Sequence, residues 1–214
     1  LGYAPNTNDL KNHLLKQGFS ETDMVEVGLL RYYENSQNTH LFFRDRVIFP
    51  VIDQKGQVVA FGGRLMEGDG PKYLNSPDHP LFNKGHILYG IKDAKTAAHA
   101  GHTVVVVEGY MDAIAMQRAG FKATVAPLGT ALTEAQIETI WRFSSPEKRN
   151  PVLCFDGDNA GQKAAERAVI RILPFIGADK SAKIAFMISG EDPDSLIKKY
   201  GPEKVKEILQ KALK

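Results

Sequence analysis

The sequence has little cysteine, no long apolar run and almost no net charge, and each shortage excludes a class of protein. Its 214 residues contain one cysteine, Cys154, which excludes an internal disulfide and a cysteine-rich zinc site. Cys154 stands in an apolar run, so we expect a small buried core residue. No apolar run is long enough to span a bilayer, and the first residues form no basic-then-apolar leader. We therefore expect a cytoplasmic protein without membrane contact.

The charge is nearly balanced, with 27 Lys and Arg against 25 Asp and Glu. A strongly basic nucleic-acid-binding protein would carry a larger excess, so any nucleic-acid contact must come from a local patch. Residues 197–214 hold six basic and two acidic side chains, whereas residues 102–196 hold ten and twelve. The six histidines are scattered, and no pair has metal-ligand spacing.

Residues 1–90 predict a small domain of mixed α+β type. Two short helices are expected over residues 8–18 and 20–30. Two antiparallel strands joined by a turn are expected within residues 41–66. Residues 67–86 are rich in Gly, Pro, Asn and Asp, and we expect an irregular stretch there that is either functional or disordered.

Residues 91–214 predict a second domain of α/β type. An alanine-rich helix comes first, and the apolar runs in VVVVE, ATVAPL, PVLCF and KIAFMI then alternate with three helical stretches. This alternation is typical of a parallel sheet flanked by helices. Two short amphipathic helices close the sequence, and Pro202 stands in the first turn of the second. We place the domain boundary near Gly90.

Three acidic clusters follow strand-like runs in this second domain. They are Glu108 with Asp112, Asp156 with Asp158, and Asp192 with Asp194. The carboxyl ends of parallel strands lie along one edge of a sheet, so we expect the six carboxylates to meet in one crevice. So many anions are tolerable only if some are protonated or if cations lie among them. Magnesium prefers such oxygen ligands and shares its remaining positions with phosphate, which predicts a phosphoryl- or nucleotidyl-transfer site.

The position of each carboxylate leaves some alternatives open. Asp156 comes directly after a strand, and Gly157 permits a sharp turn into a helix whose amino end favours anions. Asp158 can instead cap that helix. Glu108 would be costly to bury without a metal, a proton or a basic partner. Asp112, four residues further on, either makes an indirect contact with the site or complements the amino end of its own helix.

A second group of candidates lies in the segments FGGR and GPKYLNSP. They are Arg64, Lys72, Tyr73 and Asn75. Cations suit phosphates, an aromatic ring can stack on a base, and an amide can form hydrogen bonds. Taken by themselves, these residues are better explained as a solvated loop with two charges.

Several motifs resemble a known family when they are taken in order. EGYMD, PLGTALT, FDGDNAG and GEDPDSL resemble the Toprim domain shared by bacterial primases, type IA and type II topoisomerases and some nucleases. Upstream, FRDRVIFPVID, VVAFGGR, PKYLNSP and LFNKGHILYG are similar to the polymerase core of bacterial replicative DNA primases of the DnaG type. The resemblance covers essentially the whole chain. It implies a Toprim-type parallel sheet flanked by helices, preceded by a mixed α+β subdomain and followed by short helices.

The implied activity is the copying of single-stranded DNA into short RNA primers from ribonucleoside triphosphates. The resemblance places the metal site on five carboxylates, with Asp112 beside them: Glu108, Asp156, Asp158, Asp192 and Asp194. Glu108, Asp156 and Asp158 are the implied catalytic residues, with Glu108 as a ligand or an acid–base participant. Nucleotide and template contacts are implied for Arg44, Arg46, Arg64, Lys72, Tyr73, Asn75 and Lys84. The implied cofactor is Mg²⁺, for which Mn²⁺ can substitute.

The resemblance also implies parts that lie outside this sequence. A zinc-binding domain is expected before it, and a domain that meets the replicative helicase is expected after it. The first residues, LGYAPNTND, lack an initiator methionine and read as the continuation of a longer chain. The expected partners are single-stranded DNA, ribonucleoside triphosphates and, for the full-length protein, the helicase.

Other activities also fit an acidic crevice. A topoisomerase needs a tyrosine nucleophile on another domain, and none of the seven tyrosines is an obvious candidate. A nuclease is distinguished only by the upstream segments. A nucleic-acid-binding module with structural acids would gain no phosphodiester chemistry from Mg²⁺ or Mn²⁺. An aspartate-nucleophile phosphatase would form a covalent aspartyl-phosphate on Asp156. The upstream motifs favour a primase over all four.

Overall fold

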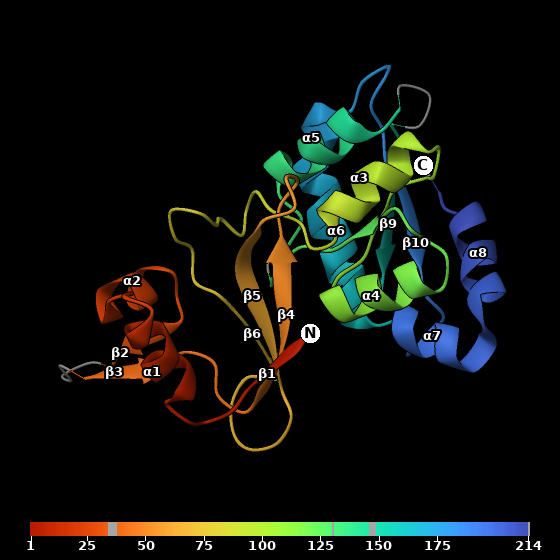
Figure 1. The fold of residues 1–214 in the computed structure, drawn as a ribbon. Coiled ribbons are helices and arrows are strands. Elements are labelled where there is room, and N and C mark those ends of the chain that lie inside the picture. Colours follow the sequence, from red (N-terminus) through yellow and green to blue (C-terminus); the bar gives the residue numbers. More distant parts are fainter. Residues whose placement is uncertain (34–37, 130, 146–148, 214) are drawn as a thin grey trace. The chain divides into compact units, whose positions relative to one another are not determined.

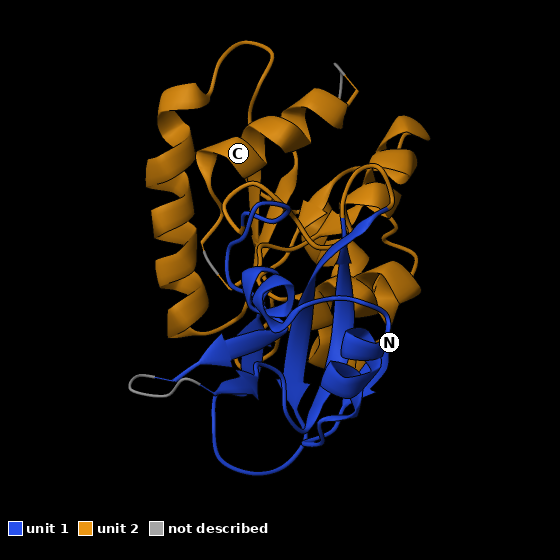
Figure 2. Ribbon diagram, turned by 60° about the vertical axis from the view of Figure 1, so that its left-hand side comes forward, with its two compact units in different colours: residues 1–52, 57–83 blue, residues 53–56, 84–214 orange. Residues whose placement is uncertain are grey.

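The chain forms two compact units. The structure, a computed structural model, describes residues 1–33, 38–129, 131–145 and 149–213. Unit 1 comprises residues 1–52 and 57–83, and unit 2 comprises residues 53–56 and 84–214 (Figure 2). The domain boundary near Gly90 stays a prediction.

Unit 1 is built on a four-stranded antiparallel sheet with the order β1-β4-β5-β6. Its strands are β1 (Gly2–Ala4), β4 (Arg46–Ile52), β5 (Val58–Leu65) and β6 (Tyr73–Asn75). A separate hairpin and two helices complete the unit: β2 (Leu30–Tyr32), β3 (Thr39–Leu41), α1 (Asp9–Lys16) and α2 (Glu21–Glu26) (Figure 1). The predicted antiparallel pair within residues 41–66 is confirmed by β4 and β5.

Two predictions for unit 1 are wrong in part. The helix expected over residues 20–30 ends at Glu26, because Gly28 has a φ of 71° and Leu30 begins a strand. A β-carbon at Gly28 would also lie 2.4 Å from the Pro77 ring. The stretch 67–86, expected to be irregular, contains β6, which pairs with β5. A strand of three residues has too few positions for an alternating pattern to be recognised.

Unit 2 contains the predicted parallel sheet, in the order β10-β9-β7-β8. The strands are β7 (Val105–Val106), β8 (Thr124–Val125), β9 (Val152–Phe155) and β10 (Lys183–Phe186). The helices are α3 (Ile91–His99), α4 (Tyr110–Arg118), α5 (Glu134–Phe143), α6 (Asn159–Ile172), α7 (Pro193–Tyr200) and α8 (Pro202–Gln210). A short 3₁₀ turn, η2 (Leu173–Phe175), follows α6. The predicted α/β class is confirmed.

The sheet of unit 2 is covered on both faces, because its strand residues alternate between two hydrophobic cores. Val106 and Leu153 pack with α3, α5 and α6 on one face. Val105 and Cys154 pack with α4, α7 and α8 on the other (Figure 1). Cys154 is 1% exposed, as predicted, and burial raises the pKa of its thiol well above the usual range. With both faces covered, ligands reach this sheet only at the ends of its strands.

No helix in the described part of the chain has the length and apolar character needed to cross a membrane.

Candidate functional site

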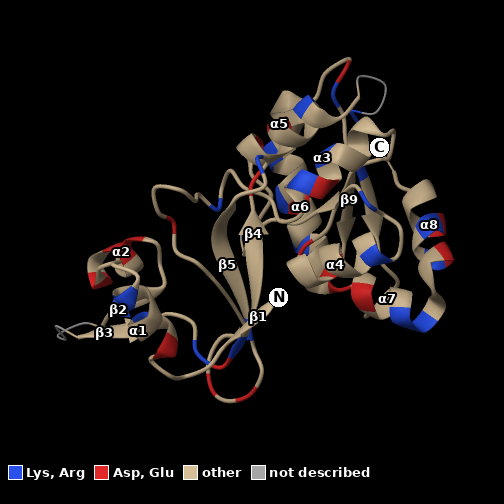
Figure 3. Ribbon diagram, in the orientation of Figure 1, with Lys and Arg blue, Asp and Glu red and all other residues tan. Residues whose placement is uncertain are grey.

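The carboxylates predicted to meet do lie at the carboxyl ends of neighbouring strands. Glu108 follows β7, Asp156 follows β9, and Asp192 lies between β10 and α7. These three strands are adjacent in the sheet. In Figure 3 the acidic segments of α4 and of the beginning of α7 lie close together. Three segments that are distant in the sequence therefore supply one acidic crevice.

Glu108 and Asp156 form the centre of this crevice. The backbone N–H of Asp156 donates a hydrogen bond of 2.9 Å to Oε1 of Glu108. One carboxylate oxygen of Asp156, Oδ1, is buried and has no hydrogen-bond partner among the described residues. A buried polar atom without a partner is costly, so this oxygen is suited to accept a proton or a cation.

The electrostatic coupling of Asp156 indicates how close the carboxylates are. Burial and, after it, the neighbouring negative charges together raise the pKa of Asp156 to about 7. Those charges belong, in decreasing order of effect, to Glu108, Asp112, Asp192 and Asp158. Asp156 is therefore partly protonated near neutral pH unless a cation takes the place of the proton.

Asp112 is perturbed in the same way. Burial raises its pKa to about 7, and the charges of Asp192 and Asp194 contribute to the rise. Backbone hydrogen bonds from Asp194 and Gly109 act in the opposite direction. Asp112 thus connects α4 to the beginning of α7. The hydrogen bond from Gly109 places Asp112 at the amino end of its own helix, which is one of the two alternatives that the sequence left open, and its indirect contact with the site stays a prediction.

The other three carboxylates already have local partners. Asp158 caps α6, with Oδ1 accepting a 2.7 Å hydrogen bond from the N–H of Gly161. Asp192 caps α7 through a 2.7 Å bond from the N–H of Ser195. Asp194 forms an ion pair with Lys198 at 2.6 Å. The capping interpretation of Asp158 is correct, and since each cap uses one oxygen, the second oxygen of Asp158 and of Asp192 can still face a ligand.

No three His, Cys, Asp or Glu side chains within the described ranges form a group that could hold a metal ion. Magnesium does not need one, because it is usually held by one or two carboxylates and completes its shell with water and substrate phosphate. The Glu108–Asp156 pair suits that kind of site, since it offers hard oxygen donors and one buried oxygen without a partner. The five-residue ligand set stays a prediction.

The chain bends at Gly157 between β9 and α6, as the sequence suggested, but a special backbone conformation is not what requires glycine there. Its φ is not in the left-handed region. A β-carbon at this position would lie 2.0 Å from the carbonyl oxygen of Ile188. Its N–H donates to the carbonyl of Glu191, and its own carbonyl accepts from the N–H of Gly190, both at 2.9 Å. Glycine is required because the loop after β9 lies directly against the loop after β10.

Sequence reasoning missed Arg167, a basic residue beside Glu108. Both side chains line a cavity of about 240 Å³ at the carboxyl ends of β7 and β9. Arg167 has no hydrogen-bond or ion-pair partner among the residues described. The sequence offered one sign of this residue. Arg167 and Arg171 are four residues apart, and that spacing places both on one face of α6. Arg171 donates a 2.8 Å hydrogen bond to the carbonyl of Leu132.

In unit 1 the structure brings together Arg64, Lys72 and Tyr73. Arg64 in β5 is paired with Tyr73 in β6. The Arg64 guanidinium lies 5.8 Å from the centre of the Tyr73 ring, and Nζ of Lys72 lies 5.6 Å from it. Asn75 pairs with Gly62, and its Oδ1 is buried without a described partner. Arg64, Tyr73 and Asn75 belong to paired strands and not to the loops expected from the sequence, whereas Lys72 lies directly before β6.

Arg44 and Arg46 are two residues apart but have different surroundings. Arg46 is 5% exposed, and its guanidinium donates to the carbonyls of Gly63 at 3.2 Å and Pro71 at 2.9 Å. It therefore fastens β5 to the segment before β6. Arg44 donates a 2.9 Å hydrogen bond to the hydroxyl of Tyr33.

Arg31 donates to the same Tyr33 hydroxyl at 2.7 Å. Sequence reasoning did not select Arg31 or Tyr33, whose proximity to Arg44 depends on the pairing of β2 with β3.

Lys84 belongs to unit 2, whereas the other six predicted contact residues belong to unit 1. Its carbonyl accepts a 2.9 Å hydrogen bond from the buried amide of Gln136. Gln136 also donates to the carbonyl of Ile87 at 2.9 Å. The segment that carries Lys84 is thus held against the beginning of α5.

Comparison with known families identifies both halves of the chain. Residues 1–95 match the family model of the DNA primase catalytic core, N-terminal domain. Residues 102–176 match the model of the Toprim domain. Among curated proteins, the DNA primase of Pseudomonas aeruginosa is 41% identical over 204 residues, which is 95% of this chain and 30% of that protein. The DNA primase of Pasteurella multocida is 37% identical over 214 residues, or 36% of its length. The chain thus spans about a third of the curated relatives it matches.

Solved structures agree with these relatives. A DNA primase domain from Pseudomonas aeruginosa matches with a TM-score of 0.90 and 40% identity, over 99% of this chain and 65% of that one. A DnaG primase catalytic domain bound to single-stranded DNA matches with a TM-score of 0.87 and 35% identity, over 99% and 67%. The RNA polymerase domain of the Mycobacterium tuberculosis primase matches with a TM-score of 0.85 and 31% identity, over 99% and 69%.

Proposed function

Because the chain belongs to the family of DnaG primase catalytic cores, we propose that it catalyses the synthesis of short RNA primers on single-stranded DNA. The reaction is a metal-dependent nucleotidyl transfer from ribonucleoside triphosphates. The observation that supports it most is the meeting of Glu108 with Asp156 in a crevice to which Asp112 and Asp192 also contribute charge. The enzyme class that follows is a DNA-directed RNA polymerase.

Magnesium, with manganese as a substitute, is the proposed cofactor. Glu108 and Asp156 would hold it, with Asp158, Asp192 and Asp194 completing the acidic site. The bound metal would lower the pKa of the primer 3′-hydroxyl and neutralise the departing pyrophosphate. The chain itself positions the carboxylates. The caps at α6 and α7 orient Asp158 and Asp192, and the close contact at Gly157 holds the loops after β9 and β10 together. Glu108 is proposed as a ligand or as a proton acceptor.

The nucleotide and template contacts are proposed for the basic and aromatic residues of unit 1 and for Lys84. Arg64, Lys72 and Tyr73 form a cluster in which two cations flank one exposed ring. Such a cluster suits a phosphodiester backbone with a stacked base. Arg44 and Asn75 are proposed as further contacts. Arg46 is buried between two carbonyls, so we assign it an indirect role through the shape of this region.

The partners follow from the same proposal. The template is single-stranded DNA, in line with the related catalytic domain that was solved bound to single-stranded DNA. The full-length protein is proposed to meet the replicative helicase through a domain outside this chain.

Zinc is assigned to no residue here. A zinc-binding domain is named in the related Aquifex aeolicus primase structure. A primase acts where the chromosome is replicated, so we place the protein in the bacterial cytoplasm.

The alternative enzymes are less well supported. Topoisomerases and nucleases share the Toprim domain, but residues 1–95 match the amino-terminal domain of the DNA primase core. A non-catalytic binding module would not require several carboxylates to remain close together at a cost in electrostatic repulsion.

Replacement of Asp156 tests the proposal. We expect Asp156→Ala to reduce Mn²⁺-dependent incorporation of labelled ribonucleotides on a single-stranded template by about a thousandfold or more. The variant should keep single-strand affinity and its circular dichroism melt. Asp93→Ala removes an exposed carboxylate from α3 and serves as the control. Undiminished primer synthesis by Asp156→Ala would refute the assignment.

A further inference from the structure

A second cavity lies at the other end of the parallel sheet, at the amino ends of the strands. It measures about 490 Å³, which is within the range of small-molecule sites. His102 and Thr103 precede β7, Lys122 precedes β8, and Lys183 begins β10. Lys206 belongs to α8. Glu108 and Asp156 follow their strands, so the two sites are at opposite ends of the sheet.

The charge of this second cavity is of one sign. Among the residues that the structure describes, three lysines and a histidine line it, and no Asp or Glu does. Lys206 has a surface partner, Glu203, at 3.3 Å. Neither Lys122 nor Lys183 forms an ion pair or a side-chain hydrogen bond with a described residue. Lys183 is half-buried, and a half-buried cation without a partner favours an anion in the adjacent space.

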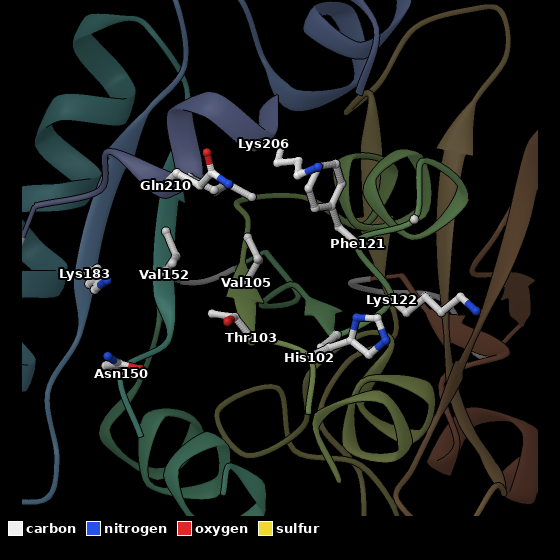
Figure 4. A pocket seen from close by; sticks show the side chains of 13 residues that line it. His102, Thr103, Val105, Phe121, Lys122, Asn150, Val152, Lys183, Lys206 and Gln210 are labelled. Carbon is white, nitrogen blue, oxygen red and sulfur yellow. The ribbon is translucent and has the colours of Figure 1, made fainter. Parts of the chain in front are cut away.

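The floor of the cavity is apolar. Val105 and Val152 lie between the basic groups (Figure 4), and Phe121 also lines the cavity. In the same view, Lys183 lies on one side of this floor and Lys122 on the other. The three lysines form a cationic rim around this floor, and inorganic phosphate would contact only that rim. A ligand with a flat ring and several phosphates would use both the rim and the floor.

We propose that this cavity binds a free nucleoside triphosphate, with the ring against Val105, Val152 and Phe121 and the phosphates near Lys122, Lys183 and Lys206. The site goes beyond primer synthesis, because the ligand lies at the far end of the sheet from the acidic crevice and takes no part in the chemistry there. ATP is a suitable probe, and EDTA keeps metal-dependent binding at the acidic crevice out of the measurement.

The test is titration of the ¹⁵N-labelled chain with ATP in EDTA, followed through backbone amide shifts. We expect shifts at Thr103 and Lys122. We also expect Lys122→Ala/Lys183→Ala to weaken the binding by about tenfold or more. Lys122→Ala alone changes an exposed side chain and should weaken it by about threefold. The control Lys92→Ala/Lys211→Ala removes the same charge from exposed positions that do not line the cavity, and should bind like the parent.

Three results would overturn the proposal. One is equal ATP affinity in the parent and in both cavity variants, with unchanged melting temperatures. Another is a set of shifts confined to residues outside the cavity. The third is inorganic tripolyphosphate binding as tightly as ATP, which would refute the role of the apolar floor. Asp156→Ala should bind ATP here unchanged, so loss of primer synthesis and loss of this site are distinguishable.

Discussion

Asp156 differs from its neighbours in having a buried oxygen without a partner. Its backbone is held by Glu108, yet Oδ1 has no hydrogen bond within the described structure. Burial and four nearby negative charges raise its pKa to about 7. In the unfolded chain an aspartate titrates near pH 4. The folded protein therefore binds a proton at this position more tightly than the unfolded chain does.

This difference gives a pH dependence of stability with a definite sign. In EDTA, the contribution of Asp156 to stability should be lost as pH rises from about 4 to about 7, because the unfolded chain loses its proton first. Asp156→Asn keeps the shape without the charge. We expect it to be more stable than the parent at pH 8 by about 1 to 3 kcal/mol and to differ little at pH 4. Denaturant melts at the two pH values measure this difference.

Asp93→Asn, on the surface of α3, is the control and should show no such change with pH. Saturating Mn²⁺ should remove the higher stability of Asp156→Asn at pH 8, since the metal stabilises only the parent. An advantage that is the same at pH 4 and pH 8 would contradict the proposed burial of a charged carboxylate.

Arg64 and Lys72 give the second prediction at the residue scale. If both contact the template backbone, Arg64→Ala and Lys72→Ala should each weaken single-strand affinity and reduce the slope of log affinity against log salt by about 1. Fluorescence anisotropy at several salt concentrations measures both quantities. Lys16→Ala, at the exposed end of α1, should leave the slope unchanged. Unchanged slopes in both variants would remove these residues from the template site.

At the scale of elements, the acidic crevice depends on the contact between two loops. The loop after β9 and the loop after β10 exchange two backbone hydrogen bonds at Gly157. A side chain at position 157 has no room. The atom nearest to its β-carbon would be the backbone carbonyl oxygen of Ile188, which cannot move away as the end of a flexible side chain could. This contact keeps Asp156 and Asp192 on neighbouring segments.

Gly157→Ala should force these loops apart. We expect a loss of stability of about 2 to 3 kcal/mol and a larger loss of primer synthesis than of single-strand binding. Gly177→Ala is the matched control, because a β-carbon there would meet nothing closer than 4.0 Å and the φ of Gly177 is not left-handed. Equal melting temperatures for the two variants would show that the close approach is not required.

The sequence predicted the elements of unit 2 better than those of unit 1. Strands β7 and β9 follow from runs such as VVVV and VLCF, which are apolar throughout because helices cover both faces. Strands β1, β2, β3 and β6 have three residues each, so they show no period and depend on pairing with distant segments. The early end of α2 has a local signal in Gly28, whose φ is positive, whereas the contact with Pro77 that excludes a side chain there is not visible from local sequence.

At the scale of the whole molecule, the topology explains why the acidic site was predictable. Neighbouring parallel strands direct their carboxyl ends to one edge, so the order of motifs along the chain was enough to group Glu108, Asp156 and Asp192. Arg167 is exposed, as an arginine on a helix usually is, and only the fold shows that it lines the same cavity as Glu108. The separate roles of Arg44 and Arg46 depend on which carbonyls lie near each guanidinium, and side-chain surroundings of that kind follow only from the three-dimensional structure.

The central claim is that carboxylates from three distant segments bind one divalent cation. Mn²⁺ is paramagnetic, and it broadens the amide signals of nearby residues. Titration of the ¹⁵N-labelled chain with substoichiometric Mn²⁺ should broaden the amides of Glu108, Asp156 and Asp192 together, and Asp156→Ala should abolish that effect. Broadening at only one of the three segments, or undiminished broadening in the variant, would contradict the account.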